Sequence, residues 1–201
     1  MNGSDKKVSA IVLAAGESKR MKGKNKLLLP FRNKTVIRTV VENIVAAELD
    51  EIIVVLGYEL EKAKSSLIYL PIKFVKNQNF EKGMTTSIQA GVRNASGDGY
   101  MICLADMVMI SSQEYAQLKK EFLLRTNEDA ACICLPRYKN EKGNPVIFSS
   151  YYRDAILQHR ETEGCKAIVQ QNKEHIHWID METPNVLLDM DSPEEYDQLK
   201  A

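Results

Sequence analysis

The 201-residue sequence has no excess of charge of either sign, because Lys and Arg together number 27 and Asp and Glu also number 27. It therefore lacks the bulk positive field that gathers nucleic acid. Aromatic residues make up only 7% of the chain and do not interleave with its densest basic stretch, residues 19–26, so a base-stacking groove is not expected. These deficits argue against a nucleic-acid partner, and the basic stretch predicts a local anion site instead.

Long apolar runs and paired cysteine motifs are missing as well. No stretch approaches the ~18 apolar residues that a membrane span needs, and Met1–Lys7 is too polar for a secretory signal. The four cysteines form no Cys-x-x-Cys pair, and Cys132 and Cys134 lie within one apolar run. We therefore expect buried, reduced thiols in a cytoplasmic protein with no membrane partner.

Short apolar runs do occur, and they alternate with helical patterns along most of the chain. The predicted strands are Val8–Leu13, Glu51–Leu56, Ile72–Val75, Tyr100–Leu104, Ala130–Leu135 and Val186–Leu188. The predicted helices are Val36–Ala47, Glu59–Ser66, Thr85–Ala95 and Ser111–Arg125. This alternation is typical of the α/β class and predicts a Rossmann-like, mostly parallel sheet with helices on both faces. We expect residues 1–201 to form a single domain, in which about 139–185 are less regular.

The first predicted strand runs directly into a loop of small residues, Ala14-Ala15-Gly16. Small residues let the backbone approach a ligand, and the loop amides can then cradle phosphate oxygens. Ser18, Arg20 and Lys26 follow, and the two cations can make charge-assisted contacts to phosphate. The spacing matches neither GxGxxG nor GxxxxGK[ST]. A plain basic turn is the alternative, but the three polar residues together favour a phosphate-binding loop.

Two aspartates are expected at the same edge of the sheet as this loop. Asp106 follows the strand Tyr100–Leu104, and Asp191 follows the last predicted strand, with Asp189 as a neighbour that could replace it. Mg²⁺ prefers oxygen ligands and is often held by one or two carboxylates together with substrate phosphates. An aspartate after a strand is also a common turn or cap residue. Next to the glycine loop, the pair predicts a metal site.

Six segments, taken in order, resemble the molybdenum cofactor nucleotidyltransferases, and in particular their cytidylyltransferase branch. The segments are Leu13–Met21, Lys26–Pro30, Gly83–Ile88, Leu104–Met107, Gly143–Val146 and Asp189–Tyr196. Several motifs in the right order across nearly the whole chain are more specific than any one of them. Relatives that use GTP typically have Ala-Gly-Gly where this chain has Ala14-Ala15-Gly16, which favours CTP.

The resemblance implies a nucleotidyltransferase that moves CMP from CTP to the terminal phosphate of molybdenum-molybdopterin, giving molybdopterin cytosine dinucleotide and pyrophosphate. It implies catalytic roles for Arg20, Lys26 and Asp106, with Asp106 and Asp191 holding Mg²⁺, or Mn²⁺ as the alternative. The nucleotide would contact Leu13, Ala14, Ala15, Gly16, Ser18, Arg20, Lys26, Gly83, Ser87 and Asp106. The acceptor would contact Gly143, Asn144 and Pro145, within the acceptor-binding portion at about 139–185. A molybdenum hydroxylase would receive the product.

The sequence departs from the family pattern in three places. The loop from Arg20 to Lys26 is one residue longer, with Lys22 or Gly23 as the insertion, and Val108 stands where the family usually has proline. Residues 161–166 only loosely match an acceptor-side stretch. A different phosphorylated acceptor, such as a sugar phosphate, and a non-catalytic cofactor-binding chaperone therefore stay open as alternatives.

Two further patterns have an ordinary structural interpretation beside the functional one. The helix after Gly83 could simply be capped by Thr85 or Thr86. His175 and His177 alternate on a predicted strand near Asp180, where a metal pair is possible but a packed or solvated strand face is the expectation.

Overall fold

Strand β1 (Val8–Ala14) lies at the centre of the sheet in the computed structural model, which describes residues 6–21 and 23–200. Residues 1–5 of the polar first segment and Lys22 of the lengthened loop lie outside the described residues. Val8, Ala10 and Val12 face one apolar core, whereas Ile11 faces the other. Burial on both faces is the reason that this strand is a continuous apolar run and not an alternating one.

The central sheet has eight strands in the order β10-β7-β9-β6-β1-β4-β5, with β8 paired to β7. Parallel pairing joins β1 to β4 and β6, β4 to β5, and β7 to β10, whereas β9 is antiparallel to both its neighbours. The strands are β4 (Glu51–Leu56), β5 (Lys73–Lys76), β6 (Gly99–Leu104), β7 (Ile133–Tyr138), β8 (Glu141–Lys142), β9 (Val146–Ser149) and β10 (Ile176–Asp180). A small antiparallel pair, β2 (Pro30–Phe31) and β3 (Lys34–Thr35), lies apart. The predicted α/β class with a mostly parallel sheet is confirmed.

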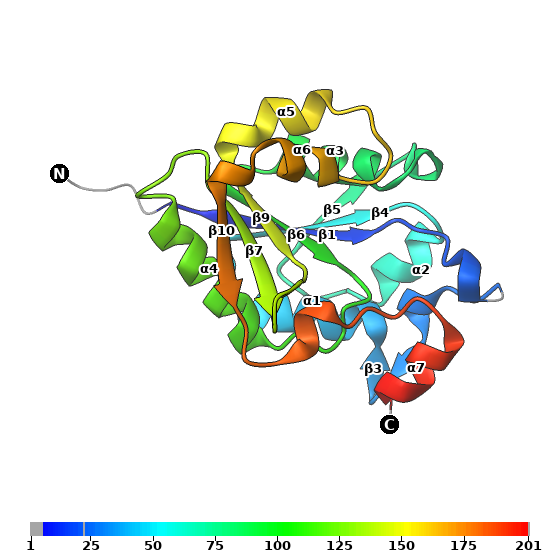
Figure 1. Cartoon of the computed structure of the whole chain (residues 1–201). Coiled ribbons are helices and arrows are strands. Elements are labelled where there is room, and N and C mark those ends of the chain that lie inside the picture. The colour runs from blue at the N-terminus through cyan, green and yellow to red at the C-terminus, as the bar shows by residue number, and fades with distance from the viewer. Residues whose placement is uncertain (1–5, 22, 201) are drawn as a thin grey trace.

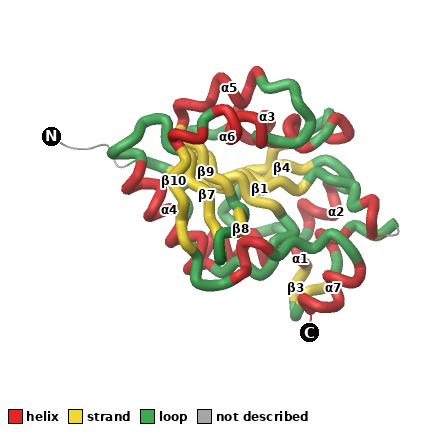
Figure 2. The backbone as a smooth tube through the Cα atoms, viewed as in Figure 1, coloured by secondary structure: helices red, strands yellow, loops and turns green. Residues whose placement is uncertain are grey.

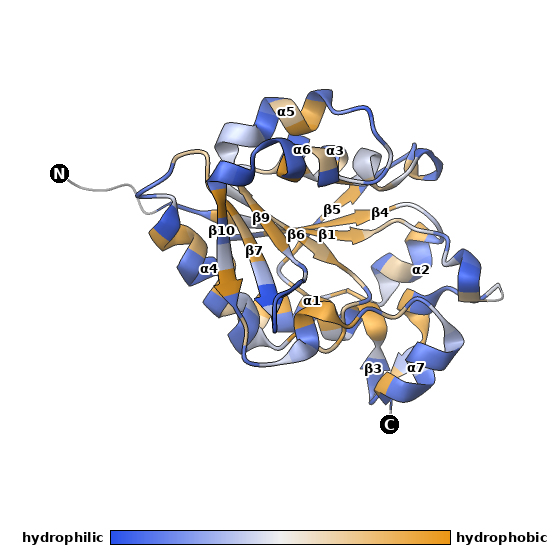
Figure 3. Cartoon of the chain, in the orientation of Figure 1, coloured by the Kyte–Doolittle hydropathy of each residue, from blue (hydrophilic) through white to orange (hydrophobic). Residues whose placement is uncertain are grey.

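Helices cover both faces of the sheet (Figures 1 and 2). On one face lie α1 (Val36–Ala46), α2 (Leu60–Ser65) and α4 (Ser112–Arg125), and on the other α3 (Met84–Asn94), α5 (Arg153–Gln158) and α6 (Lys166–Gln171). The C-terminal helix is α7 (Pro193–Lys200), and the 3-10 turns are η1 (Lys19–Met21), η2 (Lys26–Leu28), η3 (Phe80–Lys82), η4 (Ser150–Tyr152), η5 (Lys173–His175) and η6 (Pro184–Leu187). Figure 3 shows the apolar residues concentrated in the strands and the polar ones on the outer helix surfaces. Among the described helices, none combines the length and apolar character needed to cross a bilayer.

Helix α4 is tied to the C-terminal part of the chain through its first turn. Ser111 and Glu114 form a capping box, in which the Ser111 hydroxyl accepts from the Glu114 amide and the Glu114 carboxylate accepts from the Ser111 amide. The same carboxylate accepts hydrogen bonds from Thr183 (2.6 Å) and Asn185 (3.0 Å). These contacts hold the segment that leads to Asp189 against the sheet.

The predicted strand at Val186–Leu188 is wrong, because Pro184–Leu187 form η6. Thr183 caps this turn and Pro184 occupies its first position, which preorganises a helical turn. Val186 is buried and its carbonyl accepts from the Asn144 amide (2.9 Å). Three apolar residues are too few to distinguish a strand from a packed turn by periodicity.

The four cysteines are free and buried, as predicted. The sulfur atoms of Cys132 and Cys134 lie 3.5 Å apart on one strand face, inside the core. Burial raises the pKa of the Cys165 thiol to about 12. The four side chains therefore pack as small apolar groups, and the Cys165 thiol stays protonated at neutral pH.

Glu51 at the start of β4 predicts a pH-dependent loss of stability. Burial alone would raise the pKa of Glu51, but hydrogen bonds from Lys73 (2.6 Å), Ser9 (2.6 Å) and the Ser96 amide (2.9 Å) outweigh it and lower the pKa from 4.5 to about 2. The side chain is only 9% exposed. Because the folded state holds the carboxylate charged, its contribution of about 2–3 kcal/mol is complete above pH 4.5 and is lost as the pH falls toward 2.

We expect Glu51→Gln to lower the free energy of unfolding at pH 7 by about 2 kcal/mol and to flatten its decline below pH 4.5. Urea unfolding at pH 7 and pH 3 measures both effects. The matched control is Glu182→Gln. The Glu182 carboxylate is exposed and forms no ion pair with any residue that the structure describes. Equal stability of Glu51→Gln and the wild type at pH 7 would contradict the assignment.

Candidate active site

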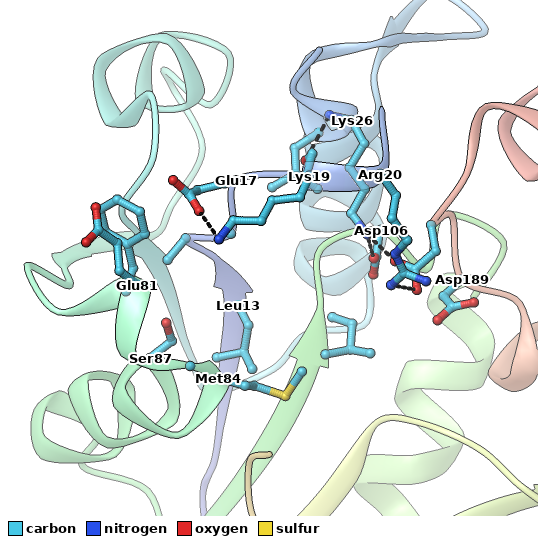
Figure 4. A pocket seen from close by; sticks show the side chains of 18 residues that line it. Leu13, Glu17, Lys19, Arg20, Lys26, Glu81, Met84, Ser87, Asp106 and Asp189 are labelled. Atoms are coloured by element: carbon cyan, nitrogen blue, oxygen red, sulfur yellow. Dashed lines mark hydrogen bonds and ion pairs between the residues drawn. The ribbon is translucent and has the colours of Figure 1, made fainter. Parts of the chain in front are cut away.

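A cavity of about 470 Å³ opens at the carboxyl ends of β1 and β6. Parallel sheets place ligands at this edge. The predicted site residues that line it are Leu13, Ala15, Gly16, Ser18, Arg20, Lys26, Gly83, Ser87, Asp106 and Asp191. Ala14 was predicted to contact the nucleotide, but it is buried at the end of β1 and does not line the cavity. Figure 4 shows Glu81 and Ser87 on one side of the cavity and Asp106 and Asp189 on the other.

The glycine loop is folded so that its two ends meet. Ser18 has a positive φ of 53°, and its hydroxyl accepts from the Lys26 amide (3.1 Å). Asn25 caps η2 by accepting from the Leu27 amide (3.1 Å). The Ala15 carbonyl accepts from the Tyr58 amide (3.1 Å), which anchors the loop beside β4. These bonds return Lys26 to the mouth of the strand from which the loop departed.

The structure itself gives no reason for a glycine at position 16. Gly16 is exposed, its φ is not in the left-handed region, and an added Cβ would meet no atom within 4 Å. Gly83 differs, because its φ is 104° and a Cβ would lie 2.7 Å from the Thr162 carbonyl oxygen. Gly16 lines the cavity with open space where a side chain would stand, which leaves its backbone accessible from the cavity.

Lys26 brings the two predicted metal-binding aspartates together. Its ammonium donates to Asp191 (2.7 Å) and also to Asp106, and Arg20 pairs with the second oxygen of Asp191. The side chains of Lys26, Asp106 and Asp191 are 16%, 12% and 26% exposed. Burial alone would lower the pKa of Lys26, but the charges of Asp106 and Asp191 raise it. Burial would raise the pKa of Asp191, yet Lys26 and then Arg20 lower it, so Lys26 and Asp191 form a charged pair at neutral pH.

The carboxylates at this edge suit a hard divalent cation. Burial, followed by the charges of Asp191 and Asp106, raises the pKa of Asp189, which shows that negative charge is in surplus here. A cation would relieve that repulsion, and carboxylate oxygens are the donors that Mg²⁺ and Mn²⁺ accept. No cluster of three His, Cys, Asp or Glu residues within the described ranges is arranged to hold a metal alone. Asp106 and Asp191 therefore fit an ion whose remaining ligands are substrate phosphates and water.

The opposite wall of the cavity is the start of α3. Gly83 occupies the N-cap position, so the alternative of Thr85 or Thr86 as the cap is wrong. The Thr85 hydroxyl instead donates to the Glu161 carbonyl and accepts from the Gly164 amide (3.0 Å), which ties α3 to the loop before α6. Ser87 accepts from the Asn77 side-chain amide (2.9 Å), so its own hydroxyl proton is free to meet a ligand.

A second cavity of about 250 Å³ adjoins the first and shares Met84 and Leu104 with it. Gly143 and Asn144 line this second cavity, whereas Pro145 is buried and does not. A Cβ on Gly143 would lie 2.5 Å from the Val186 carbonyl oxygen, so this glycine is required by packing against η6. Of the three predicted acceptor residues, two therefore face a cavity and one supports the turn.

His175 and His177 do not form a metal pair. Both rings hydrogen-bond the same oxygen of Asp129, at 3.0 and 3.1 Å, and Asp180 pairs with Arg137 (2.6 Å). The two histidines thus tie β10 to the turn before β7. The expectation of a packed strand face holds for this pair.

Several residues that line the first cavity were not among the predicted contact residues. They are Glu17, Lys19, Leu27, Phe80, Glu81, Met84 and Leu104. Glu17 and Lys19 form an ion pair at 3.0 Å on the loop itself. Asp189 was considered only as a substitute for Asp191, and the structure brings both to the cavity. Only Phe80 and Glu81 lie outside the segments that carry the family resemblance, and their proximity to Gly83 along the chain was the one signal that could have found them.

Known proteins are similar to this chain over most of its length. Residues 10–176 match the sequence profile of the MobA-like NTP transferase domain. Nicotine blue oxidoreductase of Paenarthrobacter nicotinovorans is 24% identical over 94% of both chains, and the molybdenum cofactor cytidylyltransferase of Escherichia coli K12 is 25% identical over 94% of this chain and 93% of its own. A probable molybdenum cofactor guanylyltransferase of Methanosarcina acetivorans is 29% identical over 80% of this chain and 70% of its own.

Solved structures share the fold over the whole chain. A nucleotidyl transferase from Methanothermobacter superposes with a TM-score of 0.85 at 20% identity, covering 98% of this chain and 97% of its own. Rv0371c from Mycobacterium tuberculosis, in complex with manganese, has a TM-score of 0.75 at 20% identity over 96% of this chain and 98% of its own.

Proposed function

The chain belongs to the MobA-like NTP transferase family, and we propose that it is a Mg²⁺-dependent cytidylyltransferase that acts on a molybdopterin-type acceptor. The reaction transfers CMP from CTP to the terminal phosphate of molybdenum-molybdopterin and releases pyrophosphate. The observation that carries this proposal is the buried cluster of Lys26, Asp106 and Asp191 opposite the open backbone of Gly16. Nucleotidyl transfer needs charge neutralisation and positioning of this kind more than a protein nucleophile.

The residues of the cavity have different roles in the proposed reaction. The loop at Gly16 binds the triphosphate through its backbone, and Arg20 and Lys26 neutralise its charge. A terminal phosphate oxygen of the acceptor attacks the α-phosphorus of CTP in line. The new bond joins that oxygen to the α-phosphorus, and the bond between the α-phosphorus and the α–β bridging oxygen breaks to release pyrophosphate. A Mg²⁺ ion on Asp106 and Asp191 would stabilise charge on the phosphates as a Lewis acid.

The metal could also be Mn²⁺, as the manganese complex of the Mycobacterium tuberculosis structure illustrates for that protein. Lys26 now lies between the two aspartates that would hold the ion. When the metal and the triphosphate bind together, the ammonium of Lys26 has phosphate oxygens as replacement partners.

The choice of CTP is supported by Ala15 and by the Escherichia coli relative, whose name specifies cytidylyl transfer. Ala15 lines the cavity and is 3% exposed, so its methyl group occupies room that glycine would leave. The free thiols favour the cytoplasm as the place of reaction. A molybdenum hydroxylase would be the recipient of the product.

Membership of the family does not by itself fix the reaction, because the relative named nicotine blue oxidoreductase matches over the same 94% of the chain. The alternatives of another phosphorylated acceptor and of a non-catalytic cofactor-binding chaperone share the nucleotide cavity. The paired aspartates around Lys26 favour transfer, because a carrier needs no metal beside the α-phosphate.

The decisive experiment is pyrophosphate release by the purified protein with Mg²⁺ and molybdenum-loaded molybdopterin. We expect release with CTP to exceed release with GTP or ATP by at least about 10-fold, which corresponds to about 1.4 kcal/mol of discrimination. Preference for GTP would overturn the choice of base. Binding of CTP by calorimetry without pyrophosphate release from any nucleotide would indicate a carrier or a wrong acceptor.

A further inference from the structure

The second cavity has an apolar wall and a basic rim. Ile88 and Val169 come from the helices above the sheet, and Ile102, Leu104 and Phe148 come from β6 and β9. Asn144 and Glu163 also line the cavity, but the apolar side chains of this wall offer a ligand no hydrogen bond. Desolvating sugar hydroxyls against it would cost free energy, whereas a flat ring system would gain from burial.

Two lysines line the same cavity, Lys142 from β8 and Lys166 from the start of α6. Burial and then the charge of Lys166 lower the pKa of Lys142, so the two ammonium groups act on each other. Lys142 has no carboxylate within 4 Å among the residues that the structure describes, and Lys166 reaches only the exposed Glu163 at 3.6 Å. The rim therefore carries positive charge that the protein balances only in part, which favours an anionic ligand.

Lys142 also connects this cavity to the metal edge. It lines a neighbouring hollow of about 330 Å³ together with Met107, which follows Asp106, and with Asp189. The second cavity itself meets the nucleotide cavity at Met84 and Leu104. A phosphate held at Lys142 would thus lie on the side of the second cavity that faces the aspartates.

We propose that Lys142 and Lys166 bind the phosphate group of the acceptor in this cavity. This inference rests on the proposed function, because it assigns the second cavity to the acceptor of nucleotidyl transfer. It places the phosphate contacts on two lysines that carry no other assigned role. Residues 139–185, the expected acceptor-binding portion, supply both of them.

Pyridoxal 5′-phosphate tests the pair directly, because it is an aromatic phosphate ester whose aldehyde forms an imine with a neutral lysine amine. After borohydride trapping, peptide mass mapping should show Lys142 labelled at least about 5-fold more than the exposed Lys173, since a lowered pKa and a nearby cation both favour the reaction. Pyridoxal, which lacks the phosphate, should label Lys142 several-fold less. Equal labelling of the surface lysines, or equal labelling by both reagents, would overturn the proposal.

The variant Lys166→Met should lower labelling of Lys142 by at least about 5-fold, and Lys173→Met is the matched control that should not. In the transfer assay, Lys142→Met should raise the KM for the acceptor at least about 10-fold and leave the Kd for CTP unchanged. A Lys142→Met variant with an unaltered acceptor KM would contradict the inference.

The two proposals can fail separately. Selective labelling of Lys142 without pyrophosphate release from any nucleotide would support the anion site at Lys142 and refute the transferase activity. CTP-dependent pyrophosphate release, together with unselective labelling and an unaltered acceptor KM of Lys142→Met, would support the transferase activity and refute the role of the lysine pair.

Discussion

Replacing Asp106 by asparagine should lower kcat for CTP-dependent pyrophosphate release by at least about 100-fold and leave the fold intact. Asparagine keeps the shape of the side chain but removes the charge that pairs with Lys26 and that would hold a metal ion. The fold should tolerate the change because negative charge is in surplus here, as the raised pKa of Asp189 shows. Lys26 also keeps Asp191 as a partner at 2.7 Å. We expect a change in the free energy of unfolding of less than about 1 kcal/mol.

Steady-state kinetics over a range of Mg²⁺ concentrations measure this effect, with thermal unfolding as the check on the fold. The matched control is Asp180→Asn, which removes an exposed carboxylate that pairs with Arg137 at the far side of the sheet. The control should keep its turnover. An Asp106→Asn protein that retains more than about a tenth of the wild-type kcat would refute Asp106 as a metal ligand.

Replacing Gly16 by alanine should raise the Kd for CTP at least about 10-fold without lowering stability. An added Cβ meets no atom of the protein within 4 Å, so the folded state has no clash to relieve. The same methyl group would stand where the triphosphate must approach the backbone. Calorimetric titration with CTP and Mg²⁺ measures the affinity, and urea unfolding should change by less than about 0.5 kcal/mol.

Gly83→Ala is the informative counterpart, because both glycines line the same cavity. A Cβ at Gly83 would lie 2.7 Å from the Thr162 carbonyl oxygen, and its φ of 104° strains any other residue. We expect this variant to lose about 1–3 kcal/mol of stability. If Gly16→Ala were the destabilised variant and bound CTP normally, the assignment of the loop to the triphosphate would be wrong.

Some of the site was predictable because its residues are close together in the chain. The end of β1, the small residues after it and the cap at Ser111 depend on local spacing and backbone chemistry. The C-terminal segment is similar, since the Glu195 carboxylate accepts from the Ser192 amide (2.8 Å) as the predicted capping pattern requires. Asp106 could be placed at the sheet edge because parallel strands end together there.

Other parts of the site could not be predicted from local patterns. The partners of Lys26 lie 80 and 165 residues away, and the turn at Pro184–Leu187 that carries the chain toward Asp191 was predicted as a strand. No local period encodes which carboxylate a lysine will reach across the sheet. His175 at the end of η5 and His177 on β10 likewise contact Asp129 and not Asp180, which is nearer in sequence, because the pairing of β10 with β7 determines their neighbours.

The sequence by itself determined the α/β class, the small-residue loop after β1 and the place of Asp106 at a strand end, because strand propensity and small-residue turns act within a few residues. Only the tertiary structure decided that β9 inserts antiparallel between β6 and β7, and that the residues after it enclose a second cavity. The tertiary structure alone also places Lys142 and Lys166 at the rim of the same cavity. Such contacts depend on strand order and on packing between distant segments, which carry no local signature.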